Sequence, residues 1–491
     1  MKMNYIKISV LFAALFVLGA CQDFLDREPI SVAVDEAFWS NENEVEVAVN
    51  GGYSLLRNAM TQASRYFTYG DVTSDQFSNC EWDFNFARQF SLDYSFAASE
   101  VWRPQVKHRD WTSFYRVIDW SNSIVEKVPA IPVGNFSNES VKSHLLGEGY
   151  FLRAFTYLYI TKIWGDVPMS TEVVKDVILA TNIPRSPKEE VYELIRSDID
   201  KAIALLSTSY RGKRGIRANK AVAYALKAHF EAWLGNYPET ILALDQMDAN
   251  GTYGYGPRGE SDYINRFYSG NTPDNVFFLP RLLEDMENTF ESGLDSDIAW
   301  VTGATPYHRD RPEPLFAIST SRLNALFEDQ DDIRFKYGFQ KVDQPRPMIM
   351  KYLNFSWENE GDRIGPRYSY VINIYRYTGL RLLKAEALAA VGRNAEALQI
   401  LNEVREVNEI QPLTNPDDVY QEVMEERARE LFLEGHRFFD MVRMARHKQI
   451  YKFEFITPAD FEGGKSYWPV DPILFNNNPI LTQTQFWDSR L

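Results

Sequence analysis

The stretch YTGLRLLKAEALAAVGRNAEALQILNEVREV, residues 377–407, has apolar residues at helical spacing on both sides of one glycine, Gly392. An earlier segment repeats this arrangement at an offset of 157 residues. Across that offset Leu226-Lys227-Ala228 corresponds to Leu383-Lys384-Ala385, Gly235 to Gly392, Glu239 to Glu396 and Leu244 to Leu401. The sequence therefore predicts two copies of one unit: a helix, a glycine turn and a second helix.

The two glycines explain how each copy turns. A helix commonly ends in a left-handed residue, a conformation that glycine adopts at little cost. Pro238 or Ala395 then stands near the start of the second helix. The unit resembles a tetratricopeptide hairpin, whose helices stack into a solenoid. The alternative is a chance similarity between two helical segments.

Three further segments show helical features. Ser186 and Glu189 have the spacing of a capping box, with Pro187 at the first helical position. The segment from about Val141 to Trp164 is apolar or aromatic on nearly every side, which predicts a helix buried between others. Buried core residues are expected at helical spacing in two segments. They are Val191, Ile195, Ile199, Ala202 and Leu206 after the predicted helix start, and Trp111, Phe114, Tyr115 and Ile118 in an earlier segment.

The amino-terminal residues have the pattern of a leader. Lys2 and Lys7 precede an apolar run that ends in Leu18-Gly19-Ala20-Cys21, with small residues just before a cysteine. This predicts a bacterial lipoprotein signal over residues 1–20, with Cys21 lipidated and more than one acyl chain holding it on a membrane. The alternative is an ordinary signal peptide with a chance cysteine. A transmembrane helix is disfavoured, because the run is shorter than the roughly 20 residues that a span needs.

The composition excludes several classes of function. The formal net charge is −16, and loss of Lys2 and Lys7 with the leader would make it −18. Such a surface repels phosphate backbones, so nucleic-acid binding is not expected. With Cys21 committed to lipid, Cys80 has no partner for a disulfide, and stability must come from the core.

The acids near the carboxyl end have two interpretations. Glu426, Glu430 and Glu434 lie four residues apart, with Arg429, Arg437 and Arg443 predicted on the same helix. A functional interpretation makes the acids a hydrolytic pair. The structural one, which we favour, pairs the carboxylates with arginines where the helix packs on its neighbours. Arg153, among aromatics in the predicted buried helix, is likewise expected to form an internal ion pair.

Motifs in one order along the chain carry a family resemblance. They are Asp23-Phe24-Leu25-Asp26 with Pro29; Gly149-Tyr150-Phe151-Leu152-Arg153-Ala154 through Gly165-Asp166-Val167-Pro168; Arg376-Tyr377 through Ala385-Glu386-Ala387-Leu388; Leu401-Asn402-Glu403-Val404-Arg405; Glu426-Arg427, Glu430-Leu431, Glu434-Gly435-His436-Arg437 and Phe439-Asp440; and Trp468-Pro469-Val470 with Asn478-Pro479 and Leu481. In these the chain resembles the SusD/RagB family of outer-membrane nutrient-binding lipoproteins.

The resemblance implies a mostly α-helical protein, an α-α superhelix of four tetratricopeptide-like hairpins with an irregular, loop-rich ligand-facing part. We expect an acidic tether at residues 21–30 and a single SusD-like domain at 31–491. Helices would occupy about 36–250 and 370–450, and the irregular part about 250–370. The resemblance also implies a partner, a TonB-dependent SusC-like outer-membrane transporter. The acids Asp23, Asp26 and Glu28 suggest display on the outer face.

Candidate ligand residues come from two irregular, aromatic stretches, about 69–104 and 250–370. Flat rings stack on sugar faces, and planar polar groups bind hydroxyls. The alternative for each residue is loop packing or contact with the transporter. The candidates are Asp75, Asn79, Trp82, Trp300, Tyr307 and Arg309.

We therefore expect a surface-exposed lipoprotein that binds an oligosaccharide and delivers it to the transporter, without breaking a bond. No His-Glu-x-x-His, Gly-x-Ser-x-Gly or phosphate-binding motif occurs, so no cofactor is expected. Acid-rich loops leave a structural calcium ion open, although none has EF-hand spacing. The alternatives are a lipid-anchored α-helical glycoside hydrolase or lyase, a peptide-binding uptake protein, and a protein that gates the transporter without binding ligand.

Overall fold

The computed structural model describes residues 38–77, 92–94, 108–173, 182–209, 211–256, 259–281, 298–307, 312–360, 363–488 and 490. Within these ranges, no helix combines the length and the apolar character that crossing a membrane would require. The predicted leader, Cys21, the tether and Cys80 lie outside the described residues.

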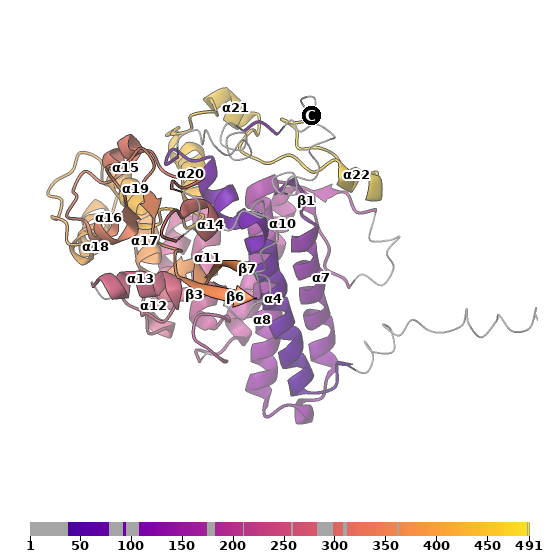
Figure 1. The fold of residues 1–491 in the computed structure, drawn as a ribbon. Coiled ribbons are helices and arrows are strands. Elements are labelled where there is room, and N and C mark those ends of the chain that lie inside the picture. The colour runs from indigo at the N-terminus through magenta and orange to yellow at the C-terminus, as the bar shows by residue number, and fades with distance from the viewer. Residues whose placement is uncertain are drawn as a thin grey trace, which may run out of the picture.

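Helices dominate the structure (Figure 1). In chain order its first part contains α4 (Glu42–Thr61), η1 (Gln62–Ser64), α5 (Arg65–Phe67), η2 (Thr68–Val72), α7 (Thr112–Lys127), η5 (Val128–Ala130), η6 (Val133–Asn135), α8 (Glu139–Trp164), β1 (Val167–Pro168), β2 (Arg185–Ser186), α10 (Lys188–Leu205), α11 (Lys220–Leu234) and α12 (Tyr237–Asn250). The remainder contains α13 (Glu260–Tyr268), β3 (Asn275–Arg281), α14 (Ile298–Thr302), α15 (Thr320–Leu326), α16 (Ile333–Gly338), β4 (Phe339–Gln340), β5 (Met348–Ile349), β6 (Phe355–Glu360), β7 (Arg363–Tyr368), β8 (Tyr370–Arg376), α17 (Tyr377–Ala390), α18 (Asn394–Val407), α19 (Val419–Glu430), α20 (Arg437–Lys448), α21 (Pro458–Glu462) and α22 (Ile473–Asn477).

The helices form two groups. In Figure 1 the long helices α4, α7 and α8 run side by side, while α17, α18 and α19 gather on the opposite side of the molecule. Strand β3 and the antiparallel pair β6–β7 belong to the stretch expected to be irregular, and β8, the partner of β3, follows it. The elements described within that stretch are short. The mostly helical class predicted from the sequence is confirmed.

Helix α8 is the buried helix that the sequence predicts. Asn138 caps its start by accepting a hydrogen bond from the Val141 amide at 3.0 Å, and Gly165 follows its end. It packs against α7, α10 and α4, so nearly its whole circumference is covered. Arg153 on this helix pairs with Asp198 of α10 at 2.7 Å, which confirms the expected internal ion pair.

Both predicted hairpins are present. Helices α11 and α12 pack together around Gly235, and α17 and α18 pack together around Gly392. The two glycines have φ angles of +80° and +83°, as a left-handed helix end requires. Helix α12 also contacts α17, so the two copies lie against each other as stacked hairpins.

The capping box predicted at Ser186 is wrong. Ser186 lies in the short strand β2, paired with Val167 of β1, and α10 begins two residues later. The acceptor for the amide of Lys188 is the carboxylate of Asp166, at 2.9 Å, from a different part of the chain. A tertiary contact has therefore replaced the local cap.

The prediction of one helix for Glu426 through Arg443 is also wrong. Helix α19 ends at Glu430, and α20 begins only at Arg437. Between them Leu433 and Gly435 have φ angles of +57° and +77°, left-handed values that reverse the chain. Glu434 therefore lies in a turn.

That turn lies directly against the amino-terminal part of the chain. A side-chain carbon added to Gly70 of η2 would lie 2.1 Å from the carbonyl oxygen of Gly435. The Gly435 amide donates to the carboxylate of Asp71 at 2.6 Å. Only a glycine lets the two backbones approach this closely.

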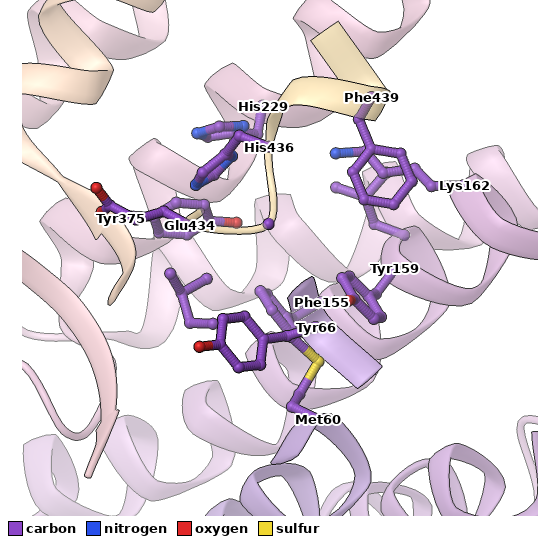
Figure 2. Close-up of a pocket in the computed structure, with 13 residues that line it drawn as sticks. Met60, Tyr66, Phe155, Tyr159, Lys162, His229, Tyr375, Glu434, His436 and Phe439 are labelled. Carbon is purple, nitrogen blue, oxygen red and sulfur yellow. The ribbon is translucent and has the colours of Figure 1, made fainter. Parts of the chain in front are cut away.

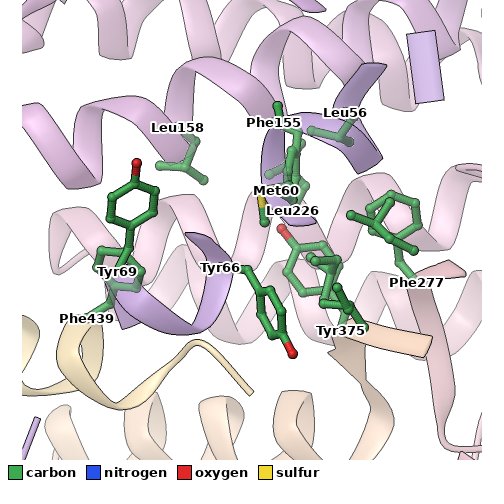
Figure 3. Close-up of a cluster of buried hydrophobic side chains, with 14 of the residues drawn as sticks. Leu56, Met60, Tyr66, Tyr69, Phe155, Leu158, Leu226, Phe277, Tyr375 and Phe439 are labelled. Carbon is green, nitrogen blue, oxygen red and sulfur yellow. The ribbon is translucent and has the colours of Figure 1, made fainter. Parts of the chain in front are cut away.

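The core is one large cluster that joins these parts, with a second cluster among α12, α17, α18 and α19. Figure 3 shows the large cluster where α4, α8 and β8 meet, with Leu56, Phe155 and Tyr375 among its members. Trp111, Phe114 and Ile118 are buried as predicted, whereas Tyr115 is only partly buried.

Candidate functional site

One predicted ligand residue, Asp75, lines an open hollow of about 160 Å³. The hollow forms where the turn after η2 meets α15, α19 and the start of α20. Its walls carry both signs of charge, an amide and a small apolar floor. They are Asp75, Gln76, Ile318, Arg322, Ala325, Leu326, Glu425, Ala428 and Arg437.

The base of the hollow is fixed by an ion pair. Asp75 accepts two hydrogen bonds from the Arg437 guanidinium, at 2.8 and 2.6 Å. Arg437 is buried, whereas the Asp75 side chain remains 27% exposed. Despite burial, which acts the other way, the neighbouring Asp75 carboxylate raises the pKa of Arg437. Asp75 therefore anchors α20 while one edge of its carboxylate faces solvent.

Two further charged groups form the rim. Arg322, on the Ser319-capped helix α15, donates to the carbonyl oxygen of Asp75 and, at 2.9 Å, to the carboxylate of Glu454. Glu425 pairs with Lys452 at 2.7 Å. Arg322 and Glu425 are both partly exposed, so a ligand can reach the guanidinium and the carboxylate.

Gln76 supplies an unused acceptor. Its amide nitrogen donates to the carbonyl of Ala428 at 2.6 Å, which fixes the orientation of the side chain. Its amide oxygen is buried and has no hydrogen-bond partner in the described part of the chain. A buried acceptor without a partner costs free energy, on the order of 1–3 kcal/mol.

Among the described residues, no other predicted ligand residue lines this hollow. Tyr307 is partly buried, and its ring lies 5.0 Å from that of Phe355. Trp300 lies in α14, and the structure does not describe its side chain. Asn79, Trp82 and Arg309 lie outside the described residues, so their role stays a prediction.

Sequence reasoning missed Gln76, Arg322 and Glu425. Gln76 is adjacent to Asp75, so its position could have indicated it. Arg322 and Glu425 reach the hollow only through the tertiary fold, and neither stands in a motif that marks it. No local signal could have identified those two.

The acids of α19 do not form a hydrolytic pair. Glu426 is salt-bridged to Arg334, and Glu430 to Arg334 and Arg376, at 2.7, 3.1 and 2.6 Å. Although burial opposes it, Arg334 and the other neighbouring arginines lower the pKa of Glu426 and of Glu430 to about 2. Both are therefore ionised and paired, which agrees with the structural interpretation. Among the described residues, no cluster of potential metal ligands occurs.

Two family models match the chain in sequence order. Residues 23–231 match a family described as "Starch-binding associating with outer membrane", and residues 340–487 match the SusD family. SusD-like protein P38 of Formosa agariphila is 26% identical to this protein, and the alignment covers 89% of this chain and 91% of the relative. A SusD-like protein of Bacteroides ovatus is 25% identical, covering 90% and 83%.

Solved structures share the fold. A SusD superfamily protein from Bacteroides thetaiotaomicron superposes with a TM-score of 0.77 at 24% identity, covering 91% of this chain and 99% of its own. A laminarin-binding SusD-like protein has a TM-score of 0.67 at 18% identity, with the same coverage.

Stacked helical hairpins, and two SusD-type family models that match the chain in sequence order, define a SusD-like protein. The chain belongs to the SusD/RagB family.

Proposed function

We propose that this protein is a cell-surface lipoprotein that binds an oligosaccharide and delivers it to a TonB-dependent SusC-like transporter. The observation that carries the proposal is the match of residues 23–231 to a family described as starch-binding and outer-membrane-associating. The laminarin-binding relative of the same fold supports a glycan as the ligand class. The role is capture without bond cleavage.

The hollow at Asp75 is the proposed part of the ligand site within the described residues. Arg322 offers a charged donor and Glu425 a charged acceptor to sugar hydroxyls, because both side chains are partly exposed. Asn79 and Trp82 follow Asp75 within seven residues of sequence. We propose that they add a stacking ring and an amide to the same site.

Lipidation at Cys21 gives the protein its place at the membrane. In the host, the wild-type protein should fractionate with the outer membrane and be reached by protease added to intact cells. A Cys21→Ser variant should leave the membrane fraction. Retention of that variant on the membrane, or a soluble periplasmic wild type, would contradict the proposed anchor.

Binding is tested by calorimetry on the Cys21→Ser protein against laminarin, starch and other glycan fragments, with a panel of peptides beside them. Heat of binding with at least one glycan is expected, without new reducing ends after long incubation. New reducing ends would indicate the hydrolase or lyase alternative. Binding to peptides alone would indicate a peptide-uptake protein. Absence of binding to both glycans and peptides would favour a gating role.

Delivery to a transporter is tested by affinity purification of the tagged full-length protein from outer membranes. The expected partner is a TonB-dependent barrel, recovered in a constant ratio to the bait. Deletion of that barrel should abolish growth on the bound glycan while leaving glycan binding intact. Recovery of the protein without any barrel would contradict the delivery step.

A further inference from the structure

A second, partly open cavity lies away from the ion-paired base of the Asp75 hollow. It has a volume of about 50 Å³, enough for a few water molecules. Helices α4, α8 and α11, strand β8 and the turn before α20 surround it (Figure 2). Its walls are Met60, Tyr66, Phe155, Leu158, Tyr159, Lys162, His229, Ile374, Tyr375, Glu434, Gly435, His436 and Phe439.

Lys162 brings a cation to this cavity without an acidic partner. Within the described residues its ammonium makes neither a hydrogen bond nor an ion pair, and it lies 5.3 and 5.2 Å from the ring centres of Trp233 and Phe439. Tyr159 stands one helical turn earlier on the same face of α8. Its hydroxyl is buried and has no hydrogen-bond partner among the described residues.

Two histidines from different elements face the same space. The rings of His229 on α11 and His436 before α20 lie 5.8 Å apart, and Tyr375 stacks on His229 at 4.7 Å. In the described part of the chain no hydrogen bond occupies either imidazole or the Tyr375 hydroxyl. Figure 2 shows these groups and Lys162 around the cavity, with Met60 at the end opposite the histidines.

The acids next to the cavity are already paired. Glu434 binds Lys351 and Arg376, each at 2.7 Å. Asp440 binds Arg427 at 3.0 Å and Arg443 at 2.8 Å. The cavity therefore presents a cation and several hydrogen-bonding groups, while its neighbouring carboxylates are neutralised by other residues.

The charges around Lys162 favour an added anion. Burial is the main cause that lowers the pKa of Lys162 to about 7, and Arg443, Arg427 and Arg446 lower it further, whereas Asp440 raises it. Burial also lowers the pKa of His436 to about 4 and that of His229 well below its usual value, so both are neutral at pH 7. An anion beside Lys162 would offset this excess of positive charge.

We propose that this cavity binds a small monocarboxylate of about three to five non-hydrogen atoms, a size that follows from its volume. The carboxylate accepts hydrogen bonds from the Lys162 ammonium, and the neutral imidazoles of His229 and His436 supply further donors. The alkyl end lies against Met60, Leu158 and Ile374. This apolar wall favours a carboxylate over phosphate, which would place polar oxygens there. The site is independent of the proposed glycan capture.

The test uses saturation-transfer NMR of the intact Cys21→Ser protein with sodium propionate, and inorganic phosphate in a parallel arm. Lys162→Met removes the charge while keeping most of the length of the side chain. Lys201→Met is the matched control, because Lys201 also lies over an aromatic ring, that of Tyr150 at 5.0 Å, but outside the cavity. Thermal unfolding of each variant checks that it folds.

Propionate should transfer signal with the wild type and with Lys201→Met. Lys162→Met should weaken binding at least tenfold. Binding should also weaken as the pH rises above 7, because the ammonium loses its proton. Absence of propionate binding, binding of phosphate alone, or equal binding by the folded Lys162→Met variant would each overturn the proposal.

Discussion

The carboxylate of Asp75 and the guanidinium of Arg437 form two hydrogen bonds, at 2.8 and 2.6 Å, across 362 residues of sequence. The pair joins the turn after η2 to the first residue of α20. Both residues also line the hollow that we propose binds a glycan. One contact therefore supports both the fold and the site.

Replacing Asp75 tests how much its ion pair with Arg437 contributes to stability. Asp75→Asn should lower the free energy of unfolding by about 2–4 kcal/mol, because the buried Arg437 loses its nearest carboxylate. Urea unfolding followed by circular dichroism measures this. Glu454→Gln, at an exposed ion pair with Arg322, is the control and should change stability by less than about 1 kcal/mol. Equal effects from the two variants would contradict the assignment.

Replacing Arg322 tests whether the hollow binds the glycan. Arg322→Ala should weaken binding of the cognate glycan by about tenfold or more, because a hydrogen bond to a charged group contributes about 1.5–3 kcal/mol. Calorimetry with the glycan found in the panel measures the change. As a control, Arg393→Ala removes an arginine whose ion pair with Glu396 is more exposed to solvent and lies outside the hollow. An unchanged affinity in Arg322→Ala would exclude this hollow as a glycan contact.

Acid should unfold the protein through the carboxylates of α19. The pKa values of Glu426 and Glu430 fall to about 2 in the folded protein, below the ordinary value of 4.5. Groups with a lowered pKa stabilise the fold above their unfolded pKa, and this stability is lost as the pH falls toward the folded pKa. The urea midpoint should therefore drop between pH 4.5 and 2.

Glu430→Gln should reduce that slope, and it should also cost about 3–5 kcal/mol at pH 7, since Arg376 and Arg334 lose a partner. Glu396→Gln removes a carboxylate whose pKa is lowered by Arg393 at the exposed surface, and it should change the slope far less. A urea midpoint that is constant from pH 4.5 to 2 in the wild type would refute the role given to these carboxylates.

The two hairpin glycines give a matched pair. Gly235→Ala and Gly392→Ala each place a side chain at a positive φ angle, which costs about 1–2 kcal/mol. At Gly235 the new methyl carbon would also lie 2.8 Å from His447, whose ring is held by the carbonyl of Trp233, while at Gly392 it meets open space. Gly235→Ala should therefore lower the melting temperature more. The reverse order would contradict this packing.

Local patterns in the sequence predicted the hairpins and the buried helix, because glycine turns and apolar periodicity act within a few residues. They failed at Ser186, where Asp166 supplies the acceptor, and at Glu434, where contact with Gly70 and Asp71 bends the chain. Both failures have the same cause: a distant segment decided the local structure.

The two sites could be predicted only in part, because distant segments also form them. Asp75 was identified from its irregular, aromatic stretch, but its partners in the hollow come from three other elements. The cavity at Lys162 was not foreseen, although a single lysine in the otherwise uncharged stretch 154–164 was a signal for it. The positions of His229 and His436 next to that lysine could be known only from the tertiary structure.

The backbone contact between Gly70 and Gly435 has a consequence for biogenesis. A ribosome must make nearly nine-tenths of the polypeptide before the second of these glycines exists, so the amino-terminal helices cannot acquire their final neighbours during early synthesis. Contacts this distant in sequence form slowly and late in folding. A product terminated shortly before Gly435 should therefore remain incompletely folded and be degraded by quality-control proteases.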